Sequence, residues 1–129
     1  MSILYQQFWN ELSDINKMRE QFSKMEDSET HILLSAIEDN KLVGSVMGII
    51  CEELYGECKP FLLVENMIVD KNCRRKGAGK ALLTELEKVA KQKNCTQVIL
   101  VTESERSDAC WFYEAYGFQL NNKGYKKKL

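Results

Sequence analysis

The alternation of apolar and polar residues divides the chain into short helices and strands. Near the N-terminus apolar residues recur every three or four positions, whereas the middle of the chain has short apolar runs separated by polar turns. The first pattern is typical of an amphipathic helix and the second of β-strands. In chain order, the pattern predicts a helix over Tyr5–Met25 that can break near Ser13-Asp14, strands over His31–Ile37, Leu42–Cys51 and Phe61–Val69, a helix containing Leu82, Leu83, Leu86, Val89 and Ala90, a strand over Gln97–Thr102, a helix over Ala109–Tyr116, and a hairpin of Phe118–Leu120 and Gly124–Lys128.

This order of elements predicts an α/β (α+β) fold, in which a mixed central sheet of about six strands is flanked by helices. The chain contains a single proline and neither a repeat nor a low-complexity segment, so no linker divides it. Residues 1–129 are therefore expected to form one domain.

Charge and cysteine content exclude several classes of protein. The 18 Lys and Arg residues are balanced by 19 Asp and Glu residues, which argues against a general nucleic-acid binder. No apolar run is long enough to span a bilayer, and the N-terminus does not resemble a signal peptide. The five widely spaced cysteines include no C-x-x-C pair, and His31 is the only histidine. We therefore expect reduced thiols in a cytoplasmic protein, no metal site, and a half-buried strand position for His31.

The stretch NCRRKGAGKALL places Arg74, Arg75 and Lys76 directly before Gly77-Ala78-Gly79, where a helix is predicted to begin. The first N–H groups of a helix have no internal partners and carry partial positive charge, and glycine lets an anion approach them. The stretch therefore predicts an anion site. The alternative is a tight turn with a solvated run of charges.

Two familiar glycine motifs do not match this stretch. A P-loop requires glycine and Ser or Thr at the positions of Arg74 and Ala81, and a dinucleotide-binding fingerprint requires glycine at the position of Leu82. The anion would therefore be held by a different kind of loop.

Two ordered motifs resemble a known family. Arg74-x-x-Gly77-x-Gly79, after a strand that ends in Met67-Ile68-Val69, resembles the Arg/Gln-x-x-Gly-x-Gly/Ala signature of the GNAT superfamily of N-acetyltransferases. Further along, the segment ACWFYEAYGF (residues 109–118) is similar to that family's A-x-x-F-Y-x-x-x-G-F segment. The resemblance extends from about His31 to the C-terminus and implies the GNAT fold, with the first strand of the family missing.

The resemblance implies acetyl-CoA as cosubstrate, no metal, and a specific set of site residues. The pyrophosphate would bind the main chain of residues 75–80, and the pantetheine arm would run along the strand before them. Glu65 and Tyr113 are the implied catalytic residues. The implied cofactor-binding residues are Met67, Ile68, Val69, Arg74, Arg75, Lys76, Gly77, Ala78, Gly79, Lys80, Arg106 and Tyr113.

Acetyl transfer to an amine requires a base, an oxyanion donor and an acid for the departing thiolate. Glu65 is the candidate base, because it lies two residues before Met67 and the side chains of a strand alternate between faces, which places both on one face. Alternatively, it pairs with a lysine at the sheet rim or binds the substrate cation. Tyr113 matches the family's general acid, and a phenol with a pKa of about 10 can protonate a thiolate. The alternative for this aromatic cluster is a core role, which we expect for Phe112 and Phe118.

Three departures from the family pattern affect this expectation. Arg75 and Arg106 stand where relatives often have glycine and asparagine, and a strand before the first helix is not evident. The bare sheet edge that would result is open to a partner subunit, as in a homodimer.

The sequence as a whole predicts an N-acetyltransferase that transfers the acetyl group of acetyl-CoA, through a tetrahedral intermediate, to a primary amine of a small molecule or an exposed protein amine. The alternative is a non-catalytic acyl-CoA-binding or sensing module on the same fold. A nucleic-acid-binding role for the basic loop and the Lys126-Lys127-Lys128 tail conflicts with the charge balance. No membrane association is expected.

Overall fold

The computed structural model describes all residues from 1 to 129, and they divide into two compact units, Met1–Ile99 and Leu100–Leu129. None of the helices combines the length and the apolar character that a membrane crossing requires. The first unit contains α1 (Ser2–Trp9), α2 (Ile15–Met25), β1 (His31–Glu38), β2 (Lys41–Cys51), β3 (Phe61–Val69), α3 (Ala78–Gln92) and β4 (Val98–Ile99), and the second contains α4 (Ser107–Tyr116).

Of the two alternatives for the N-terminal region, one helix or two, the structure has two, and the first begins at Ser2 rather than Tyr5. α1 ends at Asn10, whose φ of 53° is left-handed. Asp14 then caps α2, because its side-chain oxygen accepts hydrogen bonds from the backbone N–H groups of Asn16 at 3.0 Å and Lys17 at 3.1 Å. No strand precedes α1 in the described chain.

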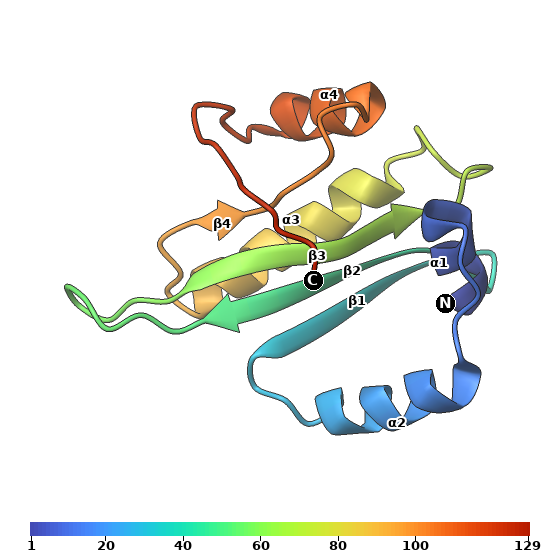
Figure 1. Cartoon of the computed structure of the whole chain (residues 1–129), viewed down its shortest axis with the longest axis horizontal. Coiled ribbons are helices and arrows are strands. Elements are labelled where there is room, and N and C mark those ends of the chain that lie inside the picture. The colour runs from blue at the N-terminus through green and yellow to red at the C-terminus, as the bar shows by residue number, and fades with distance from the viewer. The chain divides into compact units, whose positions relative to one another are not determined.

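The sheet of the first unit has the strand order β1-β2-β3-β4 (Figure 1). β1, β2 and β3 are antiparallel neighbours, whereas β4 runs parallel to β3. The predicted hairpin turn between β1 and β2 is confirmed. Its two residues, Asp39 and Asn40, have φ values of 48° and 62°, the left-handed geometry that suits the twist of a two-residue hairpin.

The core of the first unit lies between α3 and one face of the sheet. Leu82, Leu83 and Leu86 of α3 are buried, as the apolar pattern predicts. Glycines on β2 allow this close packing, because a Cβ atom at Gly48 would lie 2.6 Å from Leu86 Cδ1. A Cβ atom at Gly44 would lie 3.1 Å from the carbonyl oxygen of Ile68. The face of β2 that carries Gly44 and Gly48 therefore packs on α3.

β3 contains a β-bulge that the apolar pattern does not predict. Met47 of β2 is opposite Glu65 and Ser45 is opposite Ile68, so a single residue between them, Val46, is opposed by both Asn66 and Met67. Asn66 has a left-handed φ of 50°, which is the backbone adjustment that an extra strand residue requires. The alternation of side chains along β3 is therefore shifted by one position after Glu65.

The expected count of about six strands is wrong, since the sheet has four. The predicted strand Gln97–Thr102 is confirmed only at Val98–Ile99, and the predicted hairpin of Phe118–Leu120 and Gly124–Lys128 has no regular secondary structure. This terminal segment contains few apolar residues, and two of them are exposed, Leu120 at 76% and Tyr125 at 92%. Without a buried face, its alternation of residue types cannot hold a strand pair together.

Candidate functional site

The loop between β3 and α3 is held at its start by Asp70. The Asp70 N–H donates to the carbonyl oxygen of Val43 on β2 at 2.7 Å, and its carbonyl oxygen accepts from the Cys73 N–H at 2.8 Å. Its carboxylate accepts from the Asn72 N–H at 2.9 Å and from the side-chain amide of Gln7 at 3.4 Å. The side-chain oxygen of Gln7, Oε1, in turn accepts a hydrogen bond from the Lys71 N–H at 3.1 Å. α1 and β2 therefore fix the point at which the chain leaves the sheet.

After this anchor, the backbone N–H groups of residues 75–80 donate no hydrogen bond within the chain. Arg75 and Gly77 have left-handed φ values of 64° and 91°, and α3 begins at Ala78. A left-handed residue beside right-handed ones turns successive N–H groups toward a common concavity, and the helix N-terminus adds partial positive charge. This geometry leaves main-chain donors available to an anion. A Cβ atom at Gly77 would meet no protein atom within 4 Å, so the space there is open.

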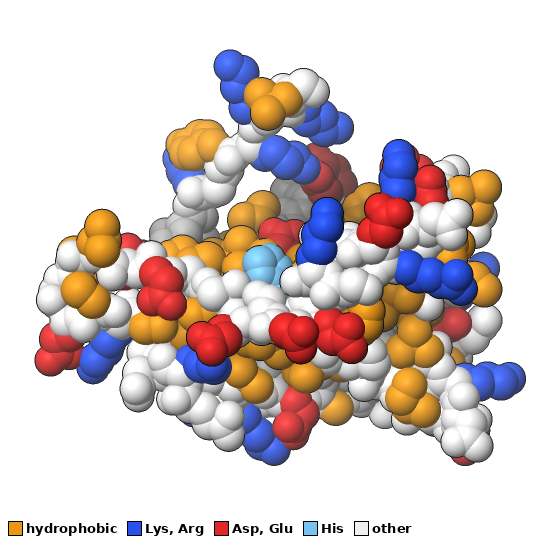
Figure 2. All heavy atoms as spheres, turned by 90° about the horizontal axis from the view of Figure 1, so that it is seen from below, with side chains coloured by type: hydrophobic (Ala, Val, Ile, Leu, Met, Phe, Trp, Pro, Cys, Tyr) orange, Lys and Arg blue, Asp and Glu red, His pale blue; other side chains and the backbone are white.

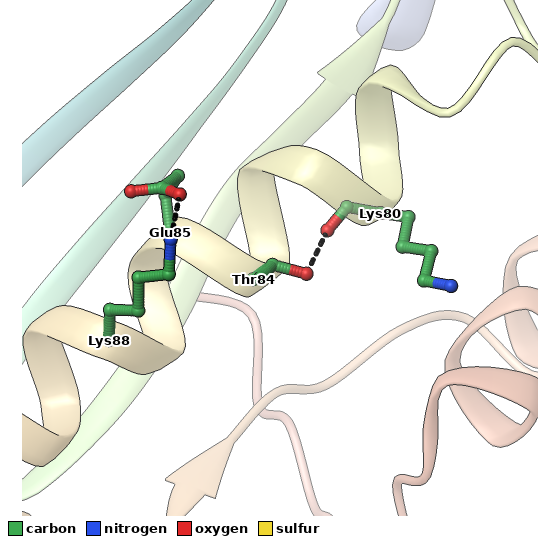
Figure 3. Close-up of polar contacts among 4 residues, drawn as sticks. All are labelled: Lys80, Thr84, Glu85 and Lys88. Carbon is green, nitrogen blue, oxygen red and sulfur yellow. Dashed lines mark hydrogen bonds and ion pairs between the residues drawn. The ribbon is translucent and has the colours of Figure 1, made fainter.

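The basic side chains around this concavity are exposed, and Arg75, Lys76 and Lys80 make no ion pair. Arg74 differs, because its Nε donates to the carbonyl oxygen of Val69 at 3.1 Å and so ties the loop to the end of β3. In Figure 3 the Lys80 side chain leaves the first turn of α3 away from the pair formed by Glu85 and Lys88. The loop therefore presents positive charge that the protein itself does not neutralise.

The edge of β3 next to the loop is open. β4 pairs with β3 only at Leu62 and Leu63, so the rest of β3, Val64–Val69, has no partner strand on that side. Met67, Ile68 and Val69 belong to this segment, and Ile68 is buried with an exposed fraction of 2%. The structure thus brings the expected β3 residues and the loop residues 74–80 together in one continuous stretch of the first unit.

Glu65 is exposed on the sheet face opposite α3. The expectation that Met67 shares this face is wrong, because the bulge places Ile68 there instead. Directly opposed strand residues point to the same side, and Ile68 is opposite Ser45 just as Glu65 is opposite Met47. The sequence did contain a sign of this irregularity, because asparagine is uncommon within strands and tolerates the left-handed conformation.

The second unit carries Arg106 and Tyr113. The predicted helix is confirmed as α4, with Arg106 at its N-cap and Gly117 at its C-cap, where φ is 123°. Burial raises the pKa of the Tyr113 phenol, and the charge of Arg106 opposes this shift. Tyr113 packs edge-on against Phe118 with ring centroids 5.8 Å apart. Phe112 and Phe118 are half-buried, whereas Trp111 is 72% exposed and does not belong to a core.

Sequence reasoning missed several residues that shape this region. Gln7 and Asp70 anchor the loop through hydrogen bonds between positions far apart in the chain, for which the sequence has no pattern. His31 is half-buried as expected, and its Nδ1 lies 3.1 Å from Thr30 Oγ1. All five cysteines are free, in agreement with the expected thiols.

Solved structures share the fold of this chain. A putative acetyltransferase from Agrobacterium tumefaciens strain C58 superposes with a TM-score of 0.91, over 99% of this chain and 90% of that one, at 23% identity. The enzyme AAC(6')-Iy, in complex with the bisubstrate analog CoA-S-monomethyl-acetylneamine, superposes with a TM-score of 0.81 over 98% of this chain and 88% of that one, at 19% identity. At these identities the likeness establishes the fold.

Curated relatives match shorter stretches. Glucosamine 6-phosphate N-acetyltransferase from Trypanosoma brucei brucei is 38% identical over 60 residues, which is 46% of this chain and 39% of that protein. The uncharacterized protein YdhI of Bacillus subtilis strain 168 is 30% identical over 77 residues, which is 60% of this chain and 45% of that protein. The chain thus spans less than half the length of the curated relatives it matches.

The family comparison covers nearly the whole chain. The family model described as acetyltransferase (GNAT) family matches residues 1–118, a range that includes the loop at residues 74–80, the bulged strand and α4. Together with the shared fold, this match identifies the chain as a member of the GNAT family of acetyltransferases.

Proposed function

We propose that this protein is an acetyl-CoA-dependent N-acetyltransferase that acts on a primary amine of a small molecule or an exposed protein amine. Membership of the GNAT family supports acetyl-CoA as the donor of the acetyl group. AAC(6')-Iy, which shares the fold, was solved with a CoA-containing bisubstrate analog, and a curated relative is named as an N-acetyltransferase. Residues 1–129 would act as one acetyltransferase domain.

The observation that carries the proposal is the run of unpartnered backbone N–H groups over residues 75–80. Several N–H groups converging on one concavity suit a group with many oxygen acceptors and two negative charges, such as the diphosphate of CoA. The exposed side chains of Arg74, Arg75, Lys76 and Lys80 add positive charge around it, with Gly77, Ala78 and Gly79 leaving the main chain accessible. Arg106, which replaces a frequent asparagine of the family, would add a further contact.

The open edge of β3 supports the placement of the pantetheine arm. Main-chain groups of Met67, Ile68 and Val69 have no partner strand on the β4 side, so an extended amide-containing chain can hydrogen-bond to them as a strand would. A backbone N–H near Met67 would stabilise the oxyanion that forms during acetyl transfer.

Glu65 and Tyr113 would move the protons of the reaction. Glu65 would take a proton from the substrate ammonium, directly or through water, so that the nitrogen lone pair can attack the acetyl carbonyl carbon. The C–N bond forms, the attacking nitrogen gives up its second proton to water, and the tetrahedral intermediate collapses with breakage of the C–S bond. The Tyr113 phenol would then protonate the thiolate that leaves. A phenol with an ordinary pKa of about 10 is protonated at neutral pH, and burial, which raises the pKa of Tyr113, keeps that proton in place until the thiolate leaves.

The proposal is tested first by calorimetric titration of the protein with CoA and by thiol release from acetyl-CoA with a panel of primary amines. We expect CoA binding and amine-dependent thiol release. Binding of CoA without thiol release for any amine would favour the non-catalytic acyl-CoA-binding module, and an absence of CoA binding would contradict both functions.

A second test concerns the general acid. Tyr113→Phe should lower turnover by about a hundredfold while CoA affinity stays nearly unchanged, because only a proton donor is removed. Tyr125→Phe makes the same chemical change at a residue that is 92% exposed and should have no effect. An equal loss of turnover and CoA affinity in Tyr113→Phe would make its role structural.

A further inference from the structure

The apolar face of α2 is not packed against the rest of the first unit. Ile15, Met18, Phe22 and Met25 recur at helical spacing, yet α2 has no buried residue. Phe22 remains 50% exposed and Ile15 45% exposed. An amphipathic helix normally buries such a stripe, so the exposed stripe indicates a surface that something else covers.

A pocket of about 160 Å³ lies beside this stripe. It is lined by Phe22, Met25 and Glu26 of α2 and by His31 and Leu33 of β1. An apolar cavity of about 150 Å³ is large enough to hold a benzene ring. Figure 2 views the molecule from the side on which Figure 1 draws α2, and the histidine (pale blue) reaches the surface there beside hydrophobic side chains.

The pocket shares a sheet face with Glu65. Leu33 on β1 is directly opposite Met47 on β2, and Met47 is directly opposite Glu65 on β3. Because opposed residues of antiparallel strands point to the same side, the three side chains form a row across the face opposite α3. Two strand spacings separate the ends of the row, which corresponds to about 10 Å.

Met47 and Leu33 are half-buried, so part of each apolar side chain between the pocket and the carboxylate remains accessible. The charge at both ends is negative, because Glu26 lines the pocket and Glu65 ends the row. Neither lysine nor arginine lines the pocket. Glu65 suits a cationic nitrogen, and Phe22, Met25 and Leu33 suit an apolar body. A phosphorylated sugar would find no cationic partner in the pocket.

We propose that the acceptor is a primary amine with an apolar, aromatic end about 10 Å from its nitrogen, with the nitrogen at Glu65 and the ring in the pocket between α2 and β1. This inference rests on the proposed function, and it adds the class of acceptor. Phe22 then acts as a specificity-determining residue, because it contacts the part of the acceptor that does not react.

The experiment compares thiol release from acetyl-CoA with 4-phenylbutylamine, n-butylamine and glucosamine 6-phosphate. The first two amines have the same nitrogen and alkyl chain and differ only in the ring. We expect kcat/KM for 4-phenylbutylamine to exceed that for n-butylamine by about tenfold or more, mainly through a lower KM, because the ring is removed from water. Glucosamine 6-phosphate should be the poorest of the three acceptors.

Phe22→Ala should make kcat/KM for 4-phenylbutylamine equal to that for n-butylamine. Turnover of n-butylamine and the affinity for CoA should stay unchanged. The residue is half-exposed, so its removal leaves the fold intact. Ile15→Ala is the matched control, since Ile15 lies on the same apolar stripe but does not line the pocket, and it should keep the full advantage.

Equal kcat/KM for the two alkylamines, a preference for glucosamine 6-phosphate, or a ring advantage that survives in Phe22→Ala would overturn the inference while the proposed function stands. Failure to bind CoA would overturn the proposed function and the inference with it.

Discussion

The two halves of β3 differ in their strand pairing and in their regularity. In the first half, Phe61–Val64, β2 pairs on one side and β4 reaches Leu62 and Leu63 on the other, and Leu62 is fully buried. In the second half, Glu65–Val69, the register is bulged, one edge has no partner strand, and a carboxylate is exposed. The same strand thus supplies both a core element and the candidate site.

The difference shows how a sheet provides reactive groups without losing its stability. Main-chain groups in a complete hydrogen-bond ladder are occupied, so a ligand can bind only where the ladder stops. β3 has a partner strand on both sides at Leu62 and Leu63, and it loses the partner on the β4 side before Glu65 and the loop. Substitutions in the two halves should therefore separate stability from ligand binding.

The largest expected effect is on the regular half. Leu62→Ala should lower the free energy of unfolding by about 2–5 kcal/mol, because a fully buried leucine leaves a cavity when it is truncated. Urea denaturation measures this loss. Leu54→Ala, at a residue that is 97% exposed, is the control and should change stability very little. A small loss of stability in Leu62→Ala would mean that the regular half of β3 does not determine the stability of the fold.

The next effect is on the loop that follows the irregular half. Gly77→Val should weaken CoA binding about tenfold or more, which is about 1.4 kcal/mol, because its side chain enters the open concavity and its φ of 91° strains a β-branched residue. Calorimetry measures the affinity. Gly56→Val introduces comparable strain at a φ of 57°, also in open space but outside this loop, and CoA affinity should be unaffected. Similar losses of affinity in both variants would remove the loop from the site.

A smaller effect is expected at the bulge itself. Asn66→Val should cost about 1–2 kcal/mol of stability, because a β-branched residue resists the left-handed φ of 50°, whereas Asn66→Gly should be nearly neutral. Thermal unfolding compares the two variants. If the bulge positions the site, Asn66→Val should also lower turnover while Asn66→Gly retains it. Equal stability of both variants would indicate that the left-handed conformation is not required.

The smallest effect concerns the second unit and appears only in alkaline solution. Burial raises the pKa of Tyr113, so the folded chain keeps the phenol proton at a pH where the unfolded chain has lost it. This stabilisation is complete below a pH of about 10, the pKa of an exposed tyrosine, and it is lost as the pH rises through the higher pKa of the folded state. The stability difference between wild type and Tyr113→Phe should therefore shrink above that pH. A difference independent of pH would show that the phenol titrates alike in both states.

Local patterns in the sequence were enough to predict most elements of the fold. The apolar spacing of α3, the helix break near Ser13-Asp14 and the polar turn at Asp39-Asn40 each depend on near neighbours, and the structure confirms them. The loop at residues 74–80 was also predictable, because its glycines and cations are adjacent in the chain. The family motifs then linked this loop to α4 across the intervening elements.

The remaining features depend on pairings between distant residues. The bulge is defined by which residue of β2 lies opposite Asn66 and Met67, and the row that joins Leu33 to Glu65 needs the register of three strands. The pocket beside α2 arises because an amphipathic helix is not packed, which its own sequence cannot indicate. The prediction of a terminal hairpin was wrong because the sequence has the alternation of a strand pair, but the structure provides no face on which that pair could be buried.

The three-way attachment of Asp70 has a thermodynamic consequence for ligand capture. Its backbone and carboxylate are tied to β2, to α1 and to its own turn before any ligand arrives. Residues 70–73 therefore have little conformational entropy left to lose, and immobilisation on binding is confined to the few positions between that attachment and the first turn of α3. Such preorganisation lets the interaction energy of a bound anion appear as affinity instead of being used to order the chain.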